Sequence, residues 1–117
     1  MNILFRVRGL APSPELLVHV HRRIVFALAR FAPRIRAVRV LLSDENGPRG
    51  GADKRVRVDI VLARRGRILV EDLSDDLFTA AARAAERGAR ALTRAVDRKR
   101  RRSRSPSLDW RGDGLPA

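Results

Sequence analysis

Apolar and polar residues alternate in four stretches of the chain, which predicts four β-strands. The first stretch covers residues 3–7, where apolar side chains share one face and Arg6 lies on the other. The remaining strands are expected at residues 35–42, 56–62 and 68–73, and residues 64–67 predict a hairpin turn between the last two. The expected inward-facing residues are Ile3, Phe5, Val7, Val38, Val40, Leu42, Val56, Val58, Ile60, Leu62, Ile68 and Val70.

Two further stretches have helical periodicity. The first opens with Ser13, Pro14 and Glu15, residue types that favour a helix start, and is expected to run to about Phe31 and stop before Pro33. The second is expected to be capped by Ser74 or Asp75 and to end near Arg98. The predicted apolar faces are Leu17, Val20, Ile24, Ala27, Leu28 and Phe31 in the first helix, and Phe78, Ala81, Ala82, Ala85, Ala89, Leu92 and Val96 in the second.

The predicted order of elements is β-α-β-β-β-α. This order indicates an α+β two-layer sandwich, in which both helices pack on one face of a four-stranded sheet. Residues 44–54 are rich in Gly, Pro and Asn, and we expect a mobile loop there. We therefore expect one domain at residues 1–98, followed by a basic, disordered tail at residues 99–117.

Charge narrows the range of functions. The 117 residues include 26 Lys and Arg against 13 Asp and Glu, a formal net charge of +13 that indicates a polyanionic partner. A high-GC genome or a need for solubility are alternative explanations of the arginine content, but neither explains where the arginines lie. The absence of cysteine excludes disulfides and agrees with a cytoplasmic location. Neither a signal peptide nor a membrane-spanning run is expected.

The second predicted helix carries a stripe of arginines. Arg83, Arg87, Arg90, Arg94 and Arg98 are four, three, four and four residues apart, so they share one side, opposite the apolar face. Only Glu86 and Asp97 lie nearby, and we expect no matched i,i+4 ion pairs. Guanidinium groups in such an array bind RNA phosphates well, although a solvated helix face is the alternative. Arg22, Arg23 and Arg30 extend the predicted RNA-binding surface onto the first helix.

Other candidate groups indicate little chemistry. Phe26 falls on the polar side of the first helix, where it either stacks on a base or, as we expect, packs against a neighbouring helix. His19 and His21 are two residues apart and point in different directions, so they are interpreted as surface residues. No nucleophile has a base at useful spacing. The sequence therefore predicts no enzyme activity, metal, cofactor or small-molecule substrate.

Several short motifs together resemble one known family. They are Met1-Asn2-Ile3, Gly9, Ser13-Pro14-Glu15-Leu16, Val56-Arg57-Val58-Asp59-Ile60, Gly66 before Ile68-Leu69-Val70, and Asp76-Leu77-Phe78-Thr79-Ala80. In this order they resemble the bacterial ribosome hibernation promoting factors, also called ribosome-associated inhibitors or sigma-54 modulation proteins. The resemblance covers roughly residues 1–98. Since no second domain follows, the chain is similar to the short form of the family.

The resemblance implies a function. Members of the family bind the small ribosomal subunit in the channel for mRNA and tRNA, where basic helix residues contact ribosomal RNA and translation stops. By this resemblance, the basic positions of the family's last helix fall on Arg83, Arg87, Arg90 and Arg94. Those of its first helix fall on Arg22 and Arg23. The chain departs from the family at Phe78, Ala81, Ala82, Gly88 and Ala91. Two alternatives remain, a general structured-RNA binder and a regulator acting through protein contacts, and the effect on ribosome pairing is open.

Overall fold

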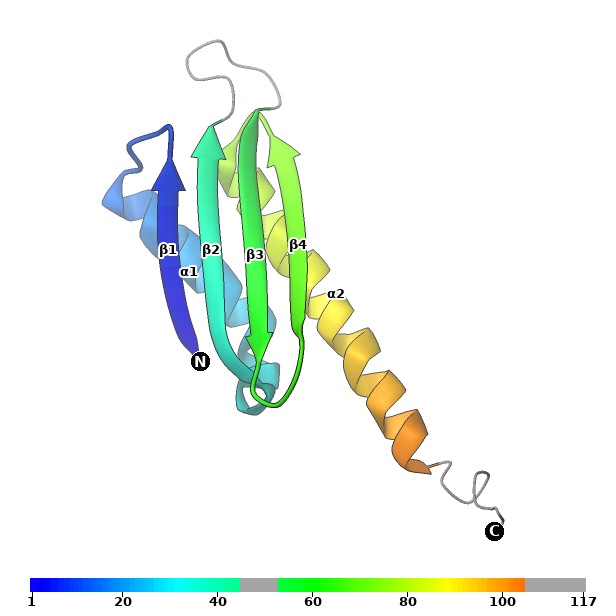
Figure 1. The fold of residues 1–117 in the computed structure, drawn as a ribbon. Coiled ribbons are helices and arrows are strands. Elements are labelled where there is room, and N and C mark those ends of the chain that lie inside the picture. Colours follow the sequence, from blue (N-terminus) through cyan, green and yellow to red (C-terminus); the bar gives the residue numbers. More distant parts are fainter. Residues whose placement is uncertain (45–52, 105–117) are drawn as a thin grey trace.

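The computed structural model describes residues 1–44 and 53–104, with side chains described as far as Arg98. Its elements follow the predicted order β-α-β-β-β-α (Figure 1). They are β1 (Asn2–Arg8), α1 (Pro14–Leu28), the 3-10 helix η1 (Ala29–Arg34), β2 (Ile35–Asp44), β3 (Lys54–Leu62), β4 (Arg67–Ser74) and α2 (Leu77–Arg104). The α+β fold is confirmed.

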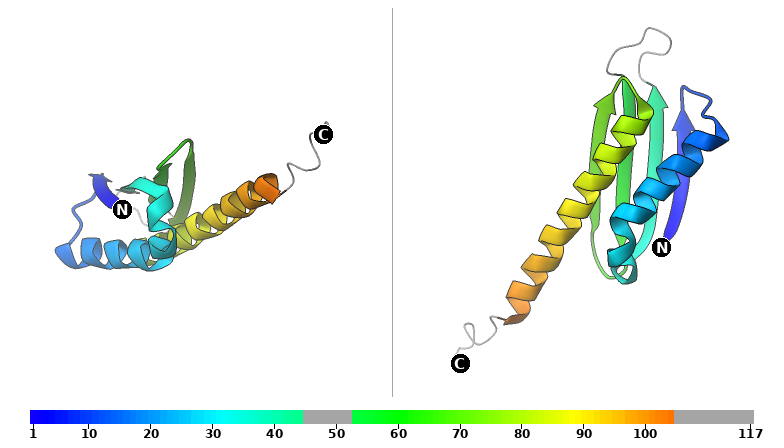
Figure 2. Two further views of the ribbon diagram at one scale, coloured as in Figure 1. Left: turned by 90° about the horizontal axis from the view of Figure 1, so that it is seen from below. Right: turned by 180° about the vertical axis from the view of Figure 1, so that it is seen from behind.

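The four strands form one sheet in the order β1-β2-β3-β4. β1 is parallel to β2, whereas β2, β3 and β4 form an antiparallel meander. The predicted alternation holds across the sheet, since Phe5, Val40, Val58 and Val70 lie in one cross-strand row. Both helices cover the same face and run in the same direction beside each other (Figure 2). Among the described residues, no helix or strand covers the other face of the sheet.

The core lies between the helices and the covered face of the sheet. On α1 Leu16 is buried in the core, whereas Leu17, the expected core residue, is only partly buried. On α2 the predicted face is largely confirmed, since Ala81, Ala85 and Leu92 are buried, but Phe78 is 43% exposed and the fully buried Ala84 was not expected. The residues of α2 that pack on the sheet and on α1 are small at the start of the helix and larger further on: Ala80, Ala81, Ala84, Ala85, Gly88 and Leu92.

The first helix begins as predicted and ends earlier. The Leu16 backbone N–H donates to the Ser13 hydroxyl at 3.1 Å, so Ser13 caps α1. The α-helix stops at Leu28 and the chain continues as a 3-10 helix through Pro33, past the predicted stop. Pro33 has no N–H to bond the carbonyl four residues back, and its ring clashes with that carbonyl in α geometry. The tighter 3-10 turn avoids this conflict.

The second helix differs from the prediction at both ends. Its cap is Asp76, whose carboxylate accepts from the Phe78 backbone N–H at 3.3 Å and from the Thr79 hydroxyl at 2.9 Å. Ser74 instead accepts from the Asp76 N–H at 3.2 Å, just before the helix. The helix continues past the expected end at Arg98 to Arg104. The domain boundary at residue 98 stays a prediction, and the predicted tail and loop fall largely on residues 105–117 and 45–52, outside the described part.

Gly88 allows α2 to approach the sheet closely. A Cβ atom at this position would lie 3.1 Å from the Ile60 Cδ1 atom and 3.8 Å from Val70 Cγ2. Both contacts are tips of side chains on the covered face, and Ile60 is fully buried. A glycine inside a helix costs about 1 kcal/mol relative to alanine, and here it gives room for the packing of the helix on β3 and β4.

Substitutions at Gly88 should separate these two effects. We expect Gly88→Ala to change the free energy of unfolding by less than about 1 kcal/mol, because the gain in helix propensity offsets a slight shift of Ile60. Gly88→Leu should destabilise by about 2 kcal/mol or more, because it overpacks the interface. Urea denaturation monitored by circular dichroism measures both. Equal stability of the alanine and leucine variants would contradict a close approach at this point.

Candidate RNA-binding surface

The five predicted arginines of α2 form a continuous exposed band, called here the α2 stripe. Its members are Arg83, Arg87, Arg90, Arg94 and Arg98, and all five are exposed. The helix turns its small residues toward the sheet, which leaves the stripe on the solvent side. The geometry that the spacing predicted is therefore present in the structure.

The stripe is not free of acidic partners, contrary to the expectation from helix spacing. Arg83 and Arg87 lie 3.8 and 3.7 Å from the Asp72 carboxylate, and Arg87 also donates to the Glu71 backbone carbonyl at 2.9 Å. Asp72 shares the inward-facing side of β4, and its side chain is only 10% exposed. These contacts cross from one element to another, so a helical wheel does not reveal them. They hold the start of the stripe against β4.

Glu86 joins the two helices. Its carboxylate lies 3.5 Å from Arg23 on α1 and 4.0 Å from Arg90 on α2. The second of these is an i,i+4 pair, so the expectation that the stripe has no such pair was wrong. Further along, Arg30 donates to the Thr93 hydroxyl at 3.2 Å. Because of these contacts the basic residues of both helices form one surface, which we call the helix-layer surface. It consists of the α2 stripe with Arg22, Arg23 and Arg30.

Part of the helix-layer surface keeps uncompensated charge. Within the part of the chain that the structure describes, the side chains of Arg22, Arg94 and Arg98 make no ion pair or hydrogen bond. Solvent-exposed pairs such as Arg90 with Glu86 contribute about 1 kcal/mol or less, so they open easily. The surface can therefore present most of its guanidinium groups to an anionic partner.

Several arginines on the uncovered face of the sheet are compensated instead. Arg57 on β3 lies 3.3 Å from Glu71, its direct cross-strand partner on β4. Asp59 accepts two hydrogen bonds from Arg67, and these bonds raise the pKa of the Arg67 guanidinium above its ordinary value. Arg39 lies 3.9 Å from the same carboxylate. These pairs offset part of the positive charge on the uncovered face.

Phe26 is 82% exposed, so the prediction that it packs against a neighbouring helix was wrong. The buried side of α1 is formed by Leu16, Val20, Ile24 and Leu28. A residue two positions after Ile24 is turned by about 200° around the helix, away from the core. Phe26 therefore lies on the outer side of α1, one helical turn from Arg22 and from Arg30.

The histidines contact aromatic rings. His19 meets the Phe78 ring edge-on at 4.7 Å between centroids, and His21 lies 6.4 Å from Phe5. Among the described residues, no group of three or more His, Asp or Glu side chains is arranged to hold a metal ion. In the same part of the chain, no helix is long and apolar enough to cross a membrane.

Sequence reasoning missed one hollow at the far end of the sheet. It is lined by Arg34, Arg64 and Arg65 together with Arg98 of the stripe. Residues 64–67 were interpreted only as a turn, because nothing local in the sequence indicates that the hairpin, η1 and α2 meet there.

Residues 3–100 match the family described as Sigma 54 modulation protein / S30EA ribosomal protein. The chain belongs to this family. It is a family of ribosome-associated factors that are not enzymes, and it includes the hibernation factors that the motifs resemble. Membership supports ribosome binding as the function of the chain.

Solved structures of similar fold agree with this membership. A ribosomal subunit interface protein from Coxiella burnetii has a TM-score of 0.69 and 16% identity, over 83% of this chain and 99% of the other. The Protein Y N-terminal domain of Thermus thermophilus has a TM-score of 0.64 and 22% identity, over 80% and 98%. At these identities the likeness shows the fold alone. No curated protein matches the chain significantly.

The bridging role of Glu86 gives a prediction about the helix-layer surface. Glu86→Gln removes a carboxylate that holds Arg23 and Arg90, so RNA binding at low salt should tighten by about twofold to fivefold. Stability should change by less than about 1 kcal/mol, because both ion pairs are exposed. Fluorescence anisotropy with a labelled ribosomal RNA fragment measures the affinity.

The matched control for Glu86→Gln is Glu71→Gln, which makes the same charge change on the uncovered face of the sheet. A gain in affinity of the same size in both variants would show that only net charge matters. That result would contradict a specific role for the helix-layer surface.

Proposed function

We propose that this protein binds the small ribosomal subunit through the helix-layer surface and stops translation by occupying the channel for mRNA and tRNA. In this proposal Arg22, Arg23, Arg30 and the α2 stripe contact ribosomal RNA. Family membership supports the ribosome as partner. The observation that carries the rest is that eight arginines gather on one layer of the fold, and three of them, Arg22, Arg94 and Arg98, make no ion pair or hydrogen bond among the described residues.

The chemistry of the surface suits RNA phosphates. Guanidinium groups bind phosphate oxygens through two parallel hydrogen bonds, and each contact also releases condensed counterions. Arg94 and Arg98 are available without breaking any ion pair within the described residues. Arg23 and Arg90 become available when a phosphate replaces Glu86 between the helices. Two parallel helices thereby offer phosphate sites along both sides of one shallow surface.

In the proposed function, Phe26 adds a side chain that binds bases by stacking and does not bind phosphates. An exposed aromatic ring flanked by arginines is a suitable platform for an unpaired base, and stacking contributes about 1–3 kcal/mol per base. Double-stranded RNA hides the faces of its bases, so Phe26 favours single-stranded or looped segments. This supports structured ribosomal RNA as the partner over a uniform duplex.

Removing charge from the centre of the stripe should weaken ribosome binding. We expect Arg90→Ala with Arg94→Ala to lower affinity for purified small subunits by at least about tenfold at physiological salt. The slope of log affinity against log salt should decrease by about one unit for each phosphate that the variant no longer binds. Co-sedimentation across a salt series measures both quantities.

The control removes the same charge elsewhere, with Arg6→Ala and Arg8→Ala on the uncovered face of β1. We expect this variant to keep nearly normal affinity for the subunit. Unchanged sedimentation of the Arg90/Arg94 variant would reject the proposed surface and favour a regulator acting through protein contacts. Equal binding of wild-type protein to subunits and to a generic duplex RNA would favour a general RNA binder.

Phe26 should matter for binding and not for folding. Because its ring is exposed, Phe26→Ala should change stability by less than about 0.5 kcal/mol. The same change should weaken subunit binding by about fivefold or more if one base is stacked. Phe26→Trp should retain affinity and Phe26→Leu should not, because only an aromatic ring provides a stacking face. Similar affinities for the leucine and tryptophan variants would exclude stacking.

A further inference from the structure

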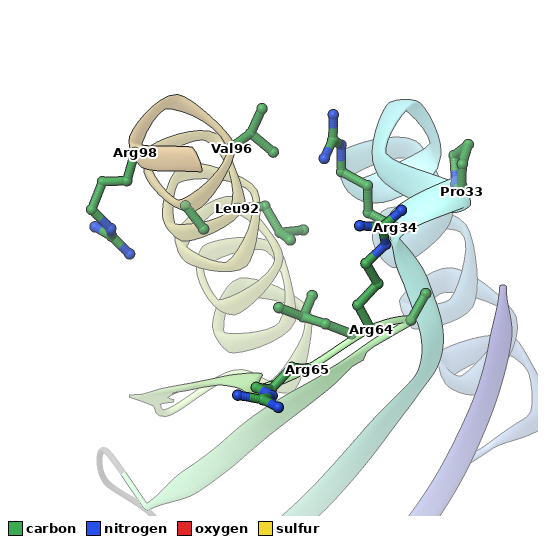
Figure 3. Close-up of a pocket in the computed structure, with 10 residues that line it drawn as sticks. Pro33, Arg34, Arg64, Arg65, Leu92, Val96 and Arg98 are labelled. Atoms are coloured by element: carbon green, nitrogen blue, oxygen red, sulfur yellow. The ribbon is translucent and has the colours of Figure 1, made fainter. Parts of the chain in front are cut away.

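A hollow of about 990 Å³ opens where η1, the β3–β4 hairpin and α2 meet (Figure 3). Leu92 and Val96 project into it from α2 and face Arg34 and Arg64 on the opposite side, while Arg98 lies at its outer edge. The residues that line it are Pro33, Arg34, Leu62, Ala63, Arg64, Arg65, Leu92, Ala95, Val96 and Arg98. Its volume falls in the range of small-molecule binding sites.

Backbone hydrogen bonds fix two walls of the hollow. The Ala63 N–H donates to the Arg34 carbonyl at 2.8 Å, which ties the hairpin to the end of η1. The Leu62 N–H donates to the Gly66 carbonyl at 3.1 Å and closes the turn, where Gly66 has a φ of 97° that favours glycine. Arg36 also donates to the Ala63 carbonyl at 3.4 Å. The hollow is therefore formed before any ligand arrives.

The lining combines an apolar floor with a cationic rim. Leu62 and Val96 are half-buried and Leu92 is almost fully buried, so the floor offers aliphatic surface to a flat group. No acidic residue is among the described residues that line the hollow. The side chains of Arg34, Arg64, Arg65 and Arg98 make no ion pair or hydrogen bond with any other residue in the described ranges. Like charges around one opening repel each other, and an anion relieves that repulsion.

We propose that this hollow is a nucleotide site, which holds one unstacked base against Leu62 and Val96 and its phosphates among the rim arginines. A base has an apolar face and planar edges, and arginine binds phosphate and also stacks on bases. Continuity with the α2 stripe through Arg98 favours a nucleotide of bound RNA over an acidic peptide. The RNA source rests on the proposed function, whereas the nucleotide chemistry rests on the hollow itself.

The test compares single-stranded and duplex RNA on the full-length protein. Anisotropy is measured with a labelled six-uridine RNA, with an abasic strand of the same length and charge, and with a duplex. Arg64→Ala with Arg65→Ala should weaken six-uridine binding by about tenfold or more. The same variant should weaken duplex binding no more than the charge-matched control, Arg6→Ala with Arg8→Ala, does. The Phe26→Ala protein, which keeps the hollow but lacks the proposed stacking ring on α1, should bind the abasic strand at least about fivefold more weakly than the six-uridine strand.

A floor variant tests the apolar contact without changing charge. Val96→Ser should weaken six-uridine binding by about threefold and leave the salt slope unchanged, because it removes apolar surface and no phosphate contact. Circular dichroism checks that the variant is folded. If the Val96→Ser protein does not fold, the Arg64/Arg65 variant and the abasic strand still test whether the hollow binds a nucleotide.

Three results would overturn the nucleotide site. They are equal loss of single-strand and duplex affinity in the Arg64/Arg65 variant, undiminished binding of the abasic strand, and displacement of six-uridine RNA by hexaglutamate at equal charge. Displacement by free uridine monophosphate would support the site with a free nucleotide as its source. Without such displacement, dependence of the six-uridine strand on Arg64 and Arg65 supports a nucleotide within RNA.

Ribosome sedimentation separates this inference from the proposed function. If the wild-type protein does not bind small subunits while six-uridine binding still depends on Arg64 and Arg65, the proposed function fails and the nucleotide site stands. If subunit binding depends on Arg90 and Arg94 while the Arg64/Arg65 variant keeps its full selectivity for single strands, the nucleotide site fails alone.

Discussion

The close packing of α2 on β3 and β4 is the contact on which the rest of the structure depends. Small residues such as Ala80, Ala84 and Gly88 let the helix approach the sheet so closely that a Cβ atom at position 88 would lie 3.1 Å from the Ile60 Cδ1 atom. This approach fixes the rotation of α2, because only one side of the helix lacks bulk. The arginines are then on the solvent side of necessity, and Asp72 lies beneath two of them. The positions of the charged groups on α2 and β4 therefore follow from the packing of the helix on the sheet.

Much of the fold could be predicted from local patterns, and its details could not. Strict alternation identified the inward faces of all four strands, since a period of two leaves little ambiguity. On α2 only the start of the predicted face was mistaken, because Phe78 is a large apolar residue in the first turn, while close packing selects small residues such as Ala84. Three acidic or hydroxyl residues precede α2, and their hydrogen bonds decide that Asp76 is the cap.

The candidate site could also be predicted only in part from the sequence. The α2 stripe follows from spacing within one helix, so the sequence was sufficient to predict it. Asp72 and Glu86 partner arginines of other elements, and such contacts depend on the tertiary arrangement. Phe26 was misjudged because a wheel shows the direction of a side chain and not whether another element lies there. The hollow is assembled from three segments far apart in the chain, and no motif marks it.

The position of Glu86 between Arg23 and Arg90 would affect how tightly RNA binds in the proposed function. A phosphate that enters between the helices displaces a carboxylate of the protein itself. The RNA still releases its condensed counterions at that contact, so the dependence of affinity on salt counts the phosphate as usual. The displaced carboxylate stays attached to the chain, close to the two guanidinium groups. In the proposed function Glu86 is therefore an internal competitor, which lowers the affinity of every phosphate that binds Arg23 or Arg90.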